Sequence, residues 1–218
     1  LPKSLSLLEA QLAWLAETVP ANTPILLAGM DKHLPGQLVP LMERYLGNGQ
    51  AGHGWKKARV FRARAPGRVI EPAPAPGQVE VPRRGWTLSA GAGVFGRRHL
   101  DIGARFLLDH LPRDVTGEAA DLGCGNGVLG LSLAADNPQV RVTFCDVSWL
   151  AVESARDNAA ALFGPSHRHE FHLGHGLDGL ERRFDLILLN PPFHRGHAVD
   201  DGVARTLFRH ARRHLAPG

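Results

Sequence analysis

Cysteine and long apolar runs are both scarce in this chain of 218 residues. The two cysteines, Cys124 and Cys145, are too few for a disulfide-stabilised scaffold or a cysteine-rich zinc site. The sequence has no apolar run of the roughly 18 residues that a membrane-spanning helix needs, and its first residues carry no signal-peptide pattern. These absences argue against secreted and membrane proteins. We therefore expect a cytoplasmic protein. We also expect no bound metal ion, because the histidines at 167, 169, 172 and 175 have no carboxylate or thiol at ligand spacing.

Acidic residues are sparse in one part of the chain. Between Ala51 and Arg105, eleven Lys and Arg residues face three acidic residues, a net charge of +8, whereas the whole chain carries +4. Clustered cations bind polyanions because they release counterions from phosphates. This asymmetry favours a nucleic-acid partner over a protein partner. An arginine-rich bias spread over the whole chain is the alternative explanation.

A proline-rich segment divides the chain into two parts. Three prolines between residues 71 and 77 lack the backbone N–H that a helix or a central strand needs. We therefore predict an extended interdomain linker over residues 71–82, between a first part at 1–70 and a domain at 83–218. In the first part, the patterns predict helices near 4–18 and 38–46 and strands at 25–28 and 57–64.

The domain at 83–218 alternates between strand and helix patterns. After a strand at 86–88 and a helix that starts at Asp101, apolar strands are predicted at 119–122, 140–145, 170–173 and 185–189. The helices between and after them are predicted at 128–135, 149–162 and 202–215. This alternation is typical of an α/β fold with a parallel, doubly wound sheet.

The glycine-rich loop from Asp121 to Gly127 lies between a predicted strand and a predicted helix. Glycines there let the backbone turn sharply and approach a ligand closely. The spacing also matches the dinucleotide fingerprint, with Asp146 about twenty residues further on, so a nicotinamide enzyme is one alternative. Against it, Asp121 places a carboxylate at the strand end, where it suits a cationic amine better than a pyrophosphate.

The tetrapeptide Asn190-Pro191-Pro192-Phe193 follows the last apolar strand. The lone pair of an exocyclic amine on a base is delocalised into the ring, which makes the amine a poor nucleophile. The Asn190 side-chain oxygen and the Pro191 carbonyl can each accept one N–H of such an amine, while the prolines fix the backbone. Phe193 offers a face on which the base can stack, worth roughly 1–3 kcal/mol.

These two motifs resemble those of the class I S-adenosylmethionine-dependent methyltransferases, whose doubly wound sheet is Rossmann-like. The resemblance implies S-adenosylmethionine as the cofactor and Asp146 as the acceptor from both ribose hydroxyls. It implies Asn190, Pro191, Pro192 and Phe193 as the catalytic residues. The implied cofactor-binding residues are Asp121, Gly123, Cys124, Gly125, Asn126, Gly127, Asp146, Val147 and Phe95.

Further runs narrow the resemblance to bacterial ribosomal RNA guanine-N2 methyltransferases, and most closely to those of the large subunit (23S). These runs are Leu1-Pro2-Lys3-Ser4-Leu5, Trp55-Lys56-Lys57-Ala58-Arg59, Gly93-Val94-Phe95 and Leu100-Asp101-Ile102-Gly103-Ala104-Arg105-Phe106. The family implies methyl transfer to the N2 amine of one guanosine and a non-catalytic methyltransferase-like first domain. We expect a monomer. Phe95 is expected beside the methionine end of the cofactor. The expected RNA-binding residues are Lys56, Lys57, Arg59, Arg97, Arg98 and His194.

The sequence departs from that family in two places. Gly174-His175-Gly176 stands where members often have a polar amide that contacts adenine. The last strands of the class I sheet are also missing, so we expect a fragment of a longer protein. Its first residues would be the tail of the vestigial first domain.

Three alternatives to the 23S guanine-N2 prediction stay open. The 16S guanine-N2 enzyme is a close sibling of the 23S one. The same tetrapeptide also serves methyltransferases of protein glutamine and of DNA adenine. A truncated sheet that no longer holds cofactor would leave a non-catalytic RNA-binding fragment.

Overall fold

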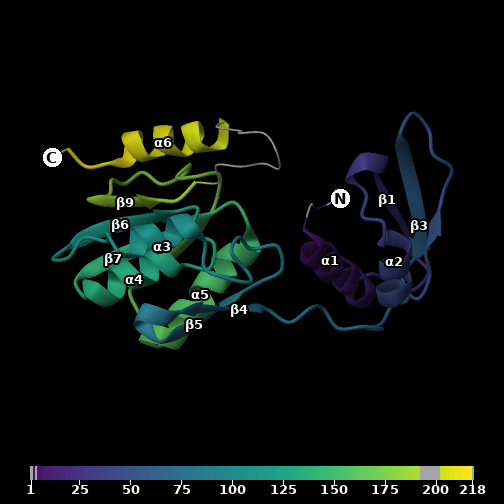
Figure 1. Cartoon of the computed structure of the whole chain (residues 1–218), viewed down its shortest axis with the longest axis horizontal. Helices are drawn as coiled ribbons and strands as arrows, with labels where there is room; N and C mark the ends of the chain where they lie inside the picture. Colours follow the sequence, from purple (N-terminus) through teal and green to yellow (C-terminus); the bar gives the residue numbers. More distant parts are fainter. Residues whose placement is uncertain (1, 3, 192–201, 218) are drawn as a thin grey trace. The chain divides into compact units, whose positions relative to one another are not determined.

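The computed structural model describes residues 2, 4–191 and 202–217 (Figure 1). The chain folds into two compact units, Leu1–Ala75 and Pro76–Gly218. The boundary between them falls inside the predicted linker. Among the described residues, no helix has both the length and the apolar character that crossing a membrane requires.

The first unit packs two helices against a small antiparallel sheet. Its elements are α1 (Leu5–Thr18), β1 (Pro24–Met30), η1 (Asp31–His33), α2 (Leu38–Leu46), β2 (Gln50–Ala51) and β3 (Ala58–Arg64). The strands lie in the order β1-β3-β2. The Ser4 side chain caps α1 by accepting from the Leu7 N–H, and Gly47 ends α2 in the left-handed conformation that a C-cap favours. The predicted elements of this part are confirmed.

The second unit begins with a hairpin that the sequence analysis placed partly in the linker. Strand β4 (Gly77–Val81) pairs antiparallel with β5 (Trp86–Ala90), and a short 3₁₀ turn, η2 (Pro82–Arg84), joins them. The linker prediction was therefore wrong from residue 77 onward. Val79 and Val81 alternate with exposed polar residues and are buried in the core. This alternation is the pattern of a strand, and it begins directly after the last of the linker prolines.

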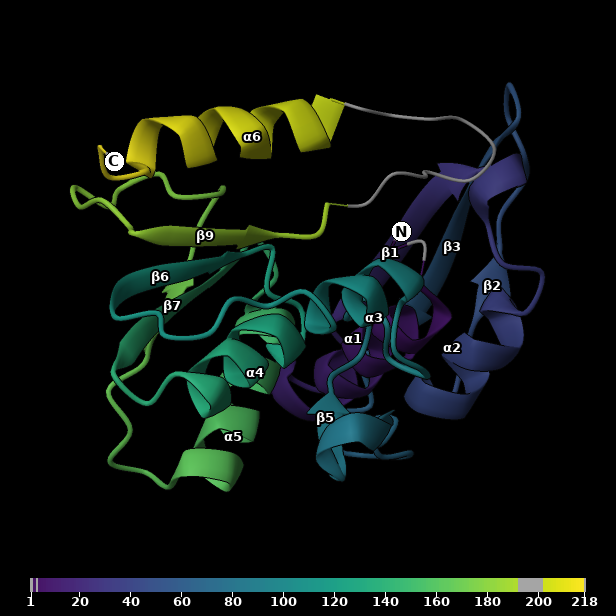
Figure 2. The same cartoon turned by 60° about the vertical axis from the view of Figure 1, so that its left-hand side comes forward.

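In the described part of the second unit, the main sheet has four parallel strands in the order β8-β7-β6-β9. The strands are β6 (Gly117–Leu122), β7 (Val140–Asp146), β8 (Glu170–Leu173) and β9 (Leu186–Leu189). The helices are α3 (Ile102–Leu108), α4 (Val128–Asp136), α5 (Trp149–Phe163) and α6 (Gly202–His214). In Figures 1 and 2, α3 and α4 lie on one side of the sheet and α6 on the other.

Two apolar clusters explain this layering. Ala119 of β6 belongs to the larger cluster, with buried residues of α4 and α5, whereas its neighbour Ala120 belongs to a smaller cluster with Ala211 of α6. Neighbouring residues of a strand point to opposite faces, so a strand that is apolar throughout needs a helix on each face. The predicted doubly wound α/β fold is confirmed.

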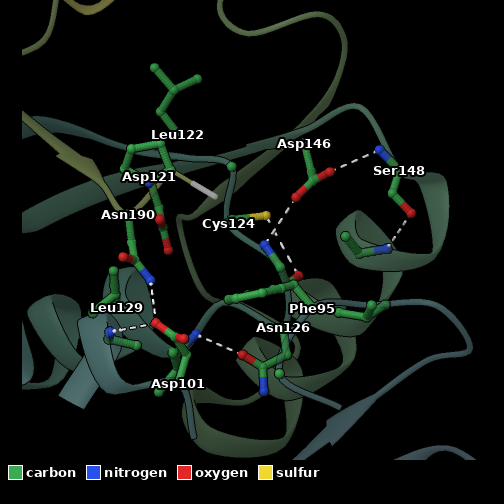
Figure 3. A pocket seen from close by; sticks show the side chains of 18 of the residues that line it. Phe95, Asp101, Asp121, Leu122, Cys124, Asn126, Leu129, Asp146, Ser148 and Asn190 are labelled. Atoms are coloured by element: carbon green, nitrogen blue, oxygen red, sulfur yellow. Dashed lines mark hydrogen bonds between the residues drawn. The ribbon is translucent and has the colours of Figure 1, made fainter. Parts of the chain in front are cut away.

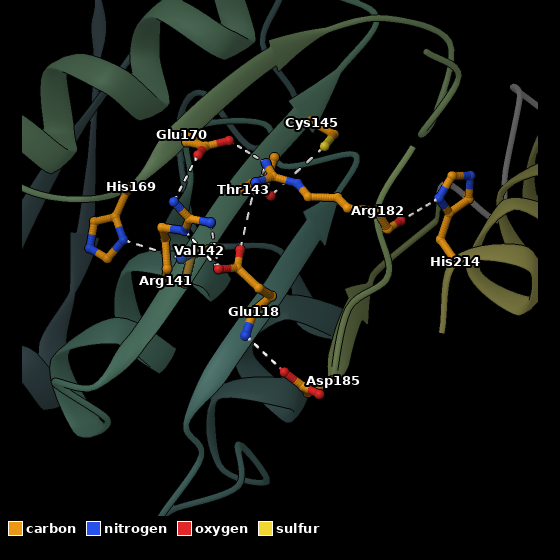
Figure 4. A network of polar contacts seen from close by, with 10 residues as sticks. All are labelled: Glu118, Arg141, Val142, Thr143, Cys145, His169, Glu170, Arg182, Asp185 and His214. Atoms are coloured by element: carbon orange, nitrogen blue, oxygen red, sulfur yellow. Dashed lines mark hydrogen bonds and ion pairs between the residues drawn. The ribbon is translucent and has the colours of Figure 1, made fainter. Parts of the chain in front are cut away.

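Charged side chains join three strands of this sheet and the loop before β9 (Figure 4). Glu118 on β6 accepts from Arg141 Nε on β7 at 2.8 Å, and Arg141 also pairs with Glu170 on β8 at 3.2 Å. Arg182 donates to Glu170 and to the Thr143 hydroxyl. The network therefore stabilises the strand order that positions the carboxyl edge of the sheet.

The strand order reverses at β6, which pairs with β7 on one side and with β9 on the other. In open parallel sheets, ligands bind beyond the carboxyl ends of the strands at such a reversal, because the loops there diverge and leave a crevice. Residues that follow β6, β7 and β9 are therefore the candidates for a functional site.

Candidate active site

A cavity of about 480 Å³ lies at this edge of the sheet (Figure 3). Its walls come from the turn after β6, the ends of β7 and β9, and the loop between β5 and α3. Figure 3 shows Asp146 and Ser148 on one side of the pocket and Asn190 and Asp101 on the other. The glycine turn and the described part of the tetrapeptide, Asn190 and Pro191, therefore share one cavity.

The turn between β6 and α4 is shaped by glycines with positive φ. A Cβ on Gly123 (φ +79°) would have no atom within 4 Å, whereas a Cβ on Gly127 (φ +84°) would lie 3.1 Å from the Ala155 Cβ. The backbone N–H groups of Gly123 and Cys124 both donate to the Cys145 carbonyl, at 2.8 and 3.0 Å. The turn is thus held against β7. No side chain covers its backbone at Gly123, so a ligand can approach the backbone closely.

Asp121 is a buried carboxylate, 2% exposed, in the wall of this cavity. Its Oδ2 accepts from the Gly130 N–H at 2.9 Å. Burial raises the pKa of Asp121 to about 7, and the nearby Asp146 charge adds to this, while the Gly130 hydrogen bond opposes it. A cationic ligand group would relieve this cost, so the geometry suits the predicted contact with an amine, which stays a prediction.

Asp146 ends β7 and holds two loops through its carboxylate. Its Oδ2 accepts from the Gly125 N–H at 3.0 Å and its Oδ1 from the Ser148 N–H at 2.9 Å. Each oxygen keeps a second lone pair for a ligand hydroxyl. Val147, next in sequence, is exposed and lines the same cavity. The predicted ribose contact is compatible with this arrangement and stays a prediction.

Three other predicted cofactor residues also line the cavity. Cys124 is buried, and burial raises the pKa of its thiol well above the usual range, so it stays a neutral apolar group. The Asn126 side chain accepts from the Val128 N–H, and its carbonyl accepts from Asn158 on α5, so this residue supports the turn. Phe95 is more than half exposed at the cavity wall.

Asn190 directly follows β9, and Pro191 is buried beside it in the cavity wall. The Asn190 Nδ2 donates to Asp101 Oδ2 at 3.1 Å. From the sequence, Asp101 was expected at the start of a helix and within a family-like run, with no link to Asn190. No spacing rule links two residues so far apart, so only the fold shows this contact. The predicted residues Pro192, Phe193 and His194 lie outside the described residues.

These residues fit a ligand with a cationic amine, neighbouring hydroxyls and an apolar body. Acidic groups lie at Asp121 and Asp146, and two glycines of the turn line the same cavity. The apolar walls include Leu129 and Val94. Such a donor set fits S-adenosylmethionine better than a pyrophosphate-bearing cofactor, because a buried carboxylate repels phosphate.

Comparison with known families supports this assignment. Residues 85–218 match the family described as "Methyltransferase small domain", which covers more than half of the chain. The chain belongs to the methyltransferase small domain family. Residues 1–67 match a second family, described as "RLMG N-terminal domain". The predicted methyltransferase fold is confirmed, whereas the origin of the first unit as a vestigial methyltransferase-like domain stays a prediction.

Individual relatives of the chain are also methyltransferases by name. The chain is 60% identical, over its whole length, to "Ribosomal RNA large subunit methyltransferase G" of Alcanivorax borkumensis, and it spans 55% of that relative. The structure of the T. Thermophilus 16S rRNA N2 G1207 methyltransferase (RsmC), in complex with AdoMet and guanosine, matches 98% of this chain and 59% of its own. Its TM-score is 0.76 at 24% identity, which shows the common fold.

A second solved structure is more distant. The SAM-dependent methyltransferase of Agrobacterium tumefaciens covers 69% of this chain and 52% of its own, with a TM-score of 0.50 at 18% identity. The chain thus spans little more than half the length of these matched relatives. The activity and substrates of the whole protein are therefore proposals.

The basic residues predicted to bind RNA occur in both units. In the first unit, the Lys56 ammonium lies 4.7 Å from the centre of the Trp55 ring, Lys57 has a positive φ, and Arg59 pairs with Asp31 at 3.4 Å. In the second unit, Arg98 lines another cavity of about 820 Å³, and Arg97 lies in the preceding bend. Further arginines of that cavity are Arg83, Arg84, Arg105 and Arg113. The RNA contacts stay predictions.

One histidine of α6 is buried. The four-residue spacing of His210 and His214 favours an exposed helix face, but His210 is only 7% exposed. His175, Asp178 and His210 place possible metal-ligating atoms within 4.8 Å of one another. However, the His210 Nδ1 accepts from the Leu177 N–H at 3.2 Å, which occupies its lone pair. This cluster carries no metal assignment, and the expected absence of a metal stays a prediction.

Proposed function

We propose that this chain is the catalytic part of an enzyme that methylates the exocyclic N2 amine of a guanosine in large-subunit (23S) ribosomal RNA. One observation carries the proposal: Asn190 lines the same cavity as the glycine turn and Asp146. An amide that can accept hydrogen bonds from an amine and a site that fits S-adenosylmethionine therefore lie in the same cavity. The name of the relative from Alcanivorax borkumensis supports the large subunit as the substrate.

The cofactor residues each have a stated role in this proposal. Asp121 would hold the cationic amine of S-adenosylmethionine, Asp146 its ribose hydroxyls, and the backbone beside Gly123 its central part. Bound there, the cofactor supplies an electrophilic methyl group on a sulfonium. Phe95 and the other apolar walls exclude water from this region, which strengthens the electrostatic contacts.

The substrate side of the pocket needs acceptors and no strong base. The Asn190 Oδ1 and the Pro191 carbonyl each accept one N–H of the amine, which directs its lone pair toward the methyl group. The amine becomes acidic only as it gains the methyl group, so a water molecule suffices to take the proton. Guanine is favoured as the base because the T. Thermophilus structure was determined with guanosine.

The test is methyl transfer by the full-length protein. Labelled S-adenosylmethionine is offered with protein-free 23S rRNA, 16S rRNA or DNA, and the product is digested to nucleosides. We expect N2-methylguanosine from 23S rRNA alone. Label in 16S rRNA would favour the sibling activity, and N6-methyladenosine in DNA would contradict the guanine assignment.

A variant tests the role of the tetrapeptide. Asn190→Ala removes the amide oxygen and should lower kcat by a factor on the order of 10²–10³, as loss of a transition-state hydrogen bond does. Binding of S-adenosylhomocysteine, measured by calorimetry, should stay unchanged. A loss below fivefold in kcat would refute this role, and a wild-type protein that binds RNA but no S-adenosylhomocysteine would favour the non-catalytic alternative.

A further inference from the structure

We propose that Asp101 is a positioning residue that fixes the orientation of the Asn190 amide, and that Gly103 leaves the space this orientation needs. The inference rests on the proposed function, because it assigns Asn190 Oδ1 as an acceptor for the substrate amine. It adds two residues from the start of α3 to a site whose motifs come from the ends of β6, β7 and β9.

The contact between Asp101 and Asn190 is specific. Asp101 Oδ2 accepts from Asn190 Nδ2 and from the Ala104 N–H, both at 3.1 Å. Asp101 is the N-cap of α3, so its own position is fixed by the helix. Both side chains line the active-site cavity, and Figure 3 shows them on the same side of it.

The charge of Asp101 decides which way the amide faces. Burial disfavours the ionised form, but hydrogen bonds from Asn190 and from backbone N–H groups of α3 outweigh it and lower the pKa of Asp101. An ionised carboxylate only accepts hydrogen bonds. It therefore selects the orientation in which Nδ2 faces Asp101 and Oδ1 remains as the acceptor.

This choice matters for the reaction that we propose. An unanchored amide can rotate by half a turn, and the wrong orientation presents two N–H donors to an amine that is itself a donor. Donation from Nδ2 to a carboxylate also polarises the amide and increases the negative charge on Oδ1. That charge stabilises the amine as it becomes positive during methyl transfer.

Gly103 supports the same arrangement. A Cβ built on Gly103 would lie 2.5 Å from Asn190 Oδ1 and 3.1 Å from Asp101 Oδ2. Gly103 does not have a positive φ, so its backbone conformation is open to any residue. A glycine therefore suits the first turn of α3 because it leaves space for the amide oxygen of Asn190. Its backbone conformation does not require a glycine.

The first test is Asp101→Asn in the full-length protein. Asparagine caps a helix as well as aspartate does, so folding should be preserved, but the new amide can donate or accept and no longer selects one orientation. We expect kcat to fall about 10–100-fold, the range for a lost hydrogen bond to a charged group. The KM for S-adenosylmethionine should stay within about twofold. Asp157→Asn, at an exposed position of α5, is the matched control and should keep full activity.

The second test is Gly103→Ala. Alanine favours a helix more than glycine does, so the thermal midpoint should stay or rise while kcat falls about 10-fold or more, because the Cβ displaces the amide oxygen. Gly36→Ala is the control, since a Cβ at Gly36 would meet no atom within 4 Å. A purely structural role of Gly103 would instead lower the midpoint.

A spectroscopic readout separates this inference from the proposed function. In the ¹⁵N-labelled protein, the Asn190 side-chain amide is assigned by its loss in Asn190→Ala. Its hydrogen exchange should be slow in the wild type and faster in Asp101→Asn. An active wild type whose Asp101→Asn variant keeps kcat within threefold, or leaves this exchange unchanged, overturns the role of Asp101 alone. A wild type that methylates no guanosine overturns the proposed function and the inference with it.

Discussion

Asp121 lies where a buried carboxylate costs stability until a ligand cation neutralises it. Burial, with the charge of Asp146, raises the pKa of Asp121 from its usual 3.8 to about 7. At 1.36 kcal/mol per pH unit, this shift corresponds to about 4 kcal/mol of destabilisation once the folded carboxyl is ionised. The structure therefore predicts that Asp121→Asn stabilises the ligand-free protein.

The pH dependence of this effect has a definite sign. Below pH 3.8 the carboxyl is protonated in both the folded and the unfolded state, so it contributes nothing. Between pH 3.8 and about 7 the folded state holds a proton that the unfolded state has lost, so stability falls as the pH rises. Above pH 7 the full cost is present.

Denaturation by urea at pH 4 and at pH 8 measures the effect. Asparagine keeps an oxygen that can accept from the Gly130 N–H but carries no charge. We expect Asp121→Asn to exceed the wild type by about 2–4 kcal/mol at pH 8 and by less than about 1 kcal/mol at pH 4. A variant less stable than the wild type at pH 8 would contradict the pKa argument.

The affinity for a cationic ligand should rise with pH over the range in which the stability of the ligand-free protein falls. The affinity of the wild type for S-adenosylhomocysteine should rise about tenfold per pH unit up to pH 7 and then level off, because its cationic amine binds the ionised carboxylate. In Asp121→Asn the affinity should be lower and nearly independent of pH over this range. Calorimetry at several pH values measures both. Equal affinities of the two proteins at pH 8 would show that the amine binds elsewhere.

Two further predictions concern stability. Gly127→Ala forces a side chain into positive φ and places its Cβ 3.1 Å from the Ala155 Cβ, so thermal denaturation should show a loss of about 1–3 kcal/mol; an unchanged midpoint would mean that the turn can relax. Arg182→Met removes one of the two arginine partners of Glu118 and Glu170 and should cost about 1 kcal/mol at pH 7, a value reduced by solvent screening of the half-exposed Glu170. The hydrogen bond from Arg182 lowers the pKa of Glu170 below its usual 4.5. The loss of stability in the variant should therefore be present above pH 4.5 and vanish as the pH falls. A loss that persists at pH 3 would mean that packing of the Arg182 side chain accounts for it.

Short-range patterns in the sequence predicted most of the helices and strands. Apolar periodicity, Gly47 after one helix and Asp101 before another are local signals that the folded chain keeps. Apolar periodicity did not predict which side chains are buried where burial depends on partners that are distant in the sequence. Ile102 and Phe106 have the spacing of an apolar helix face, yet both are mostly exposed, while Ala104 is buried. His210 shows the reverse error, because its neighbours come from the loop after β8.

The sequence by itself determined that the glycine turn and Asn190 lie at the same edge of the sheet. Each follows an apolar strand, and the carboxyl ends of parallel strands meet at one edge. The pairing of β6 with β9 in the folded chain then brings both to one cavity. Only the tertiary structure decided what holds Asn190 in place. Its partner Asp101 is 89 residues away, at the N-cap of α3, and no periodicity relates positions that distant. Contacts of that kind arise when elements pack, and their chemistry becomes visible only then.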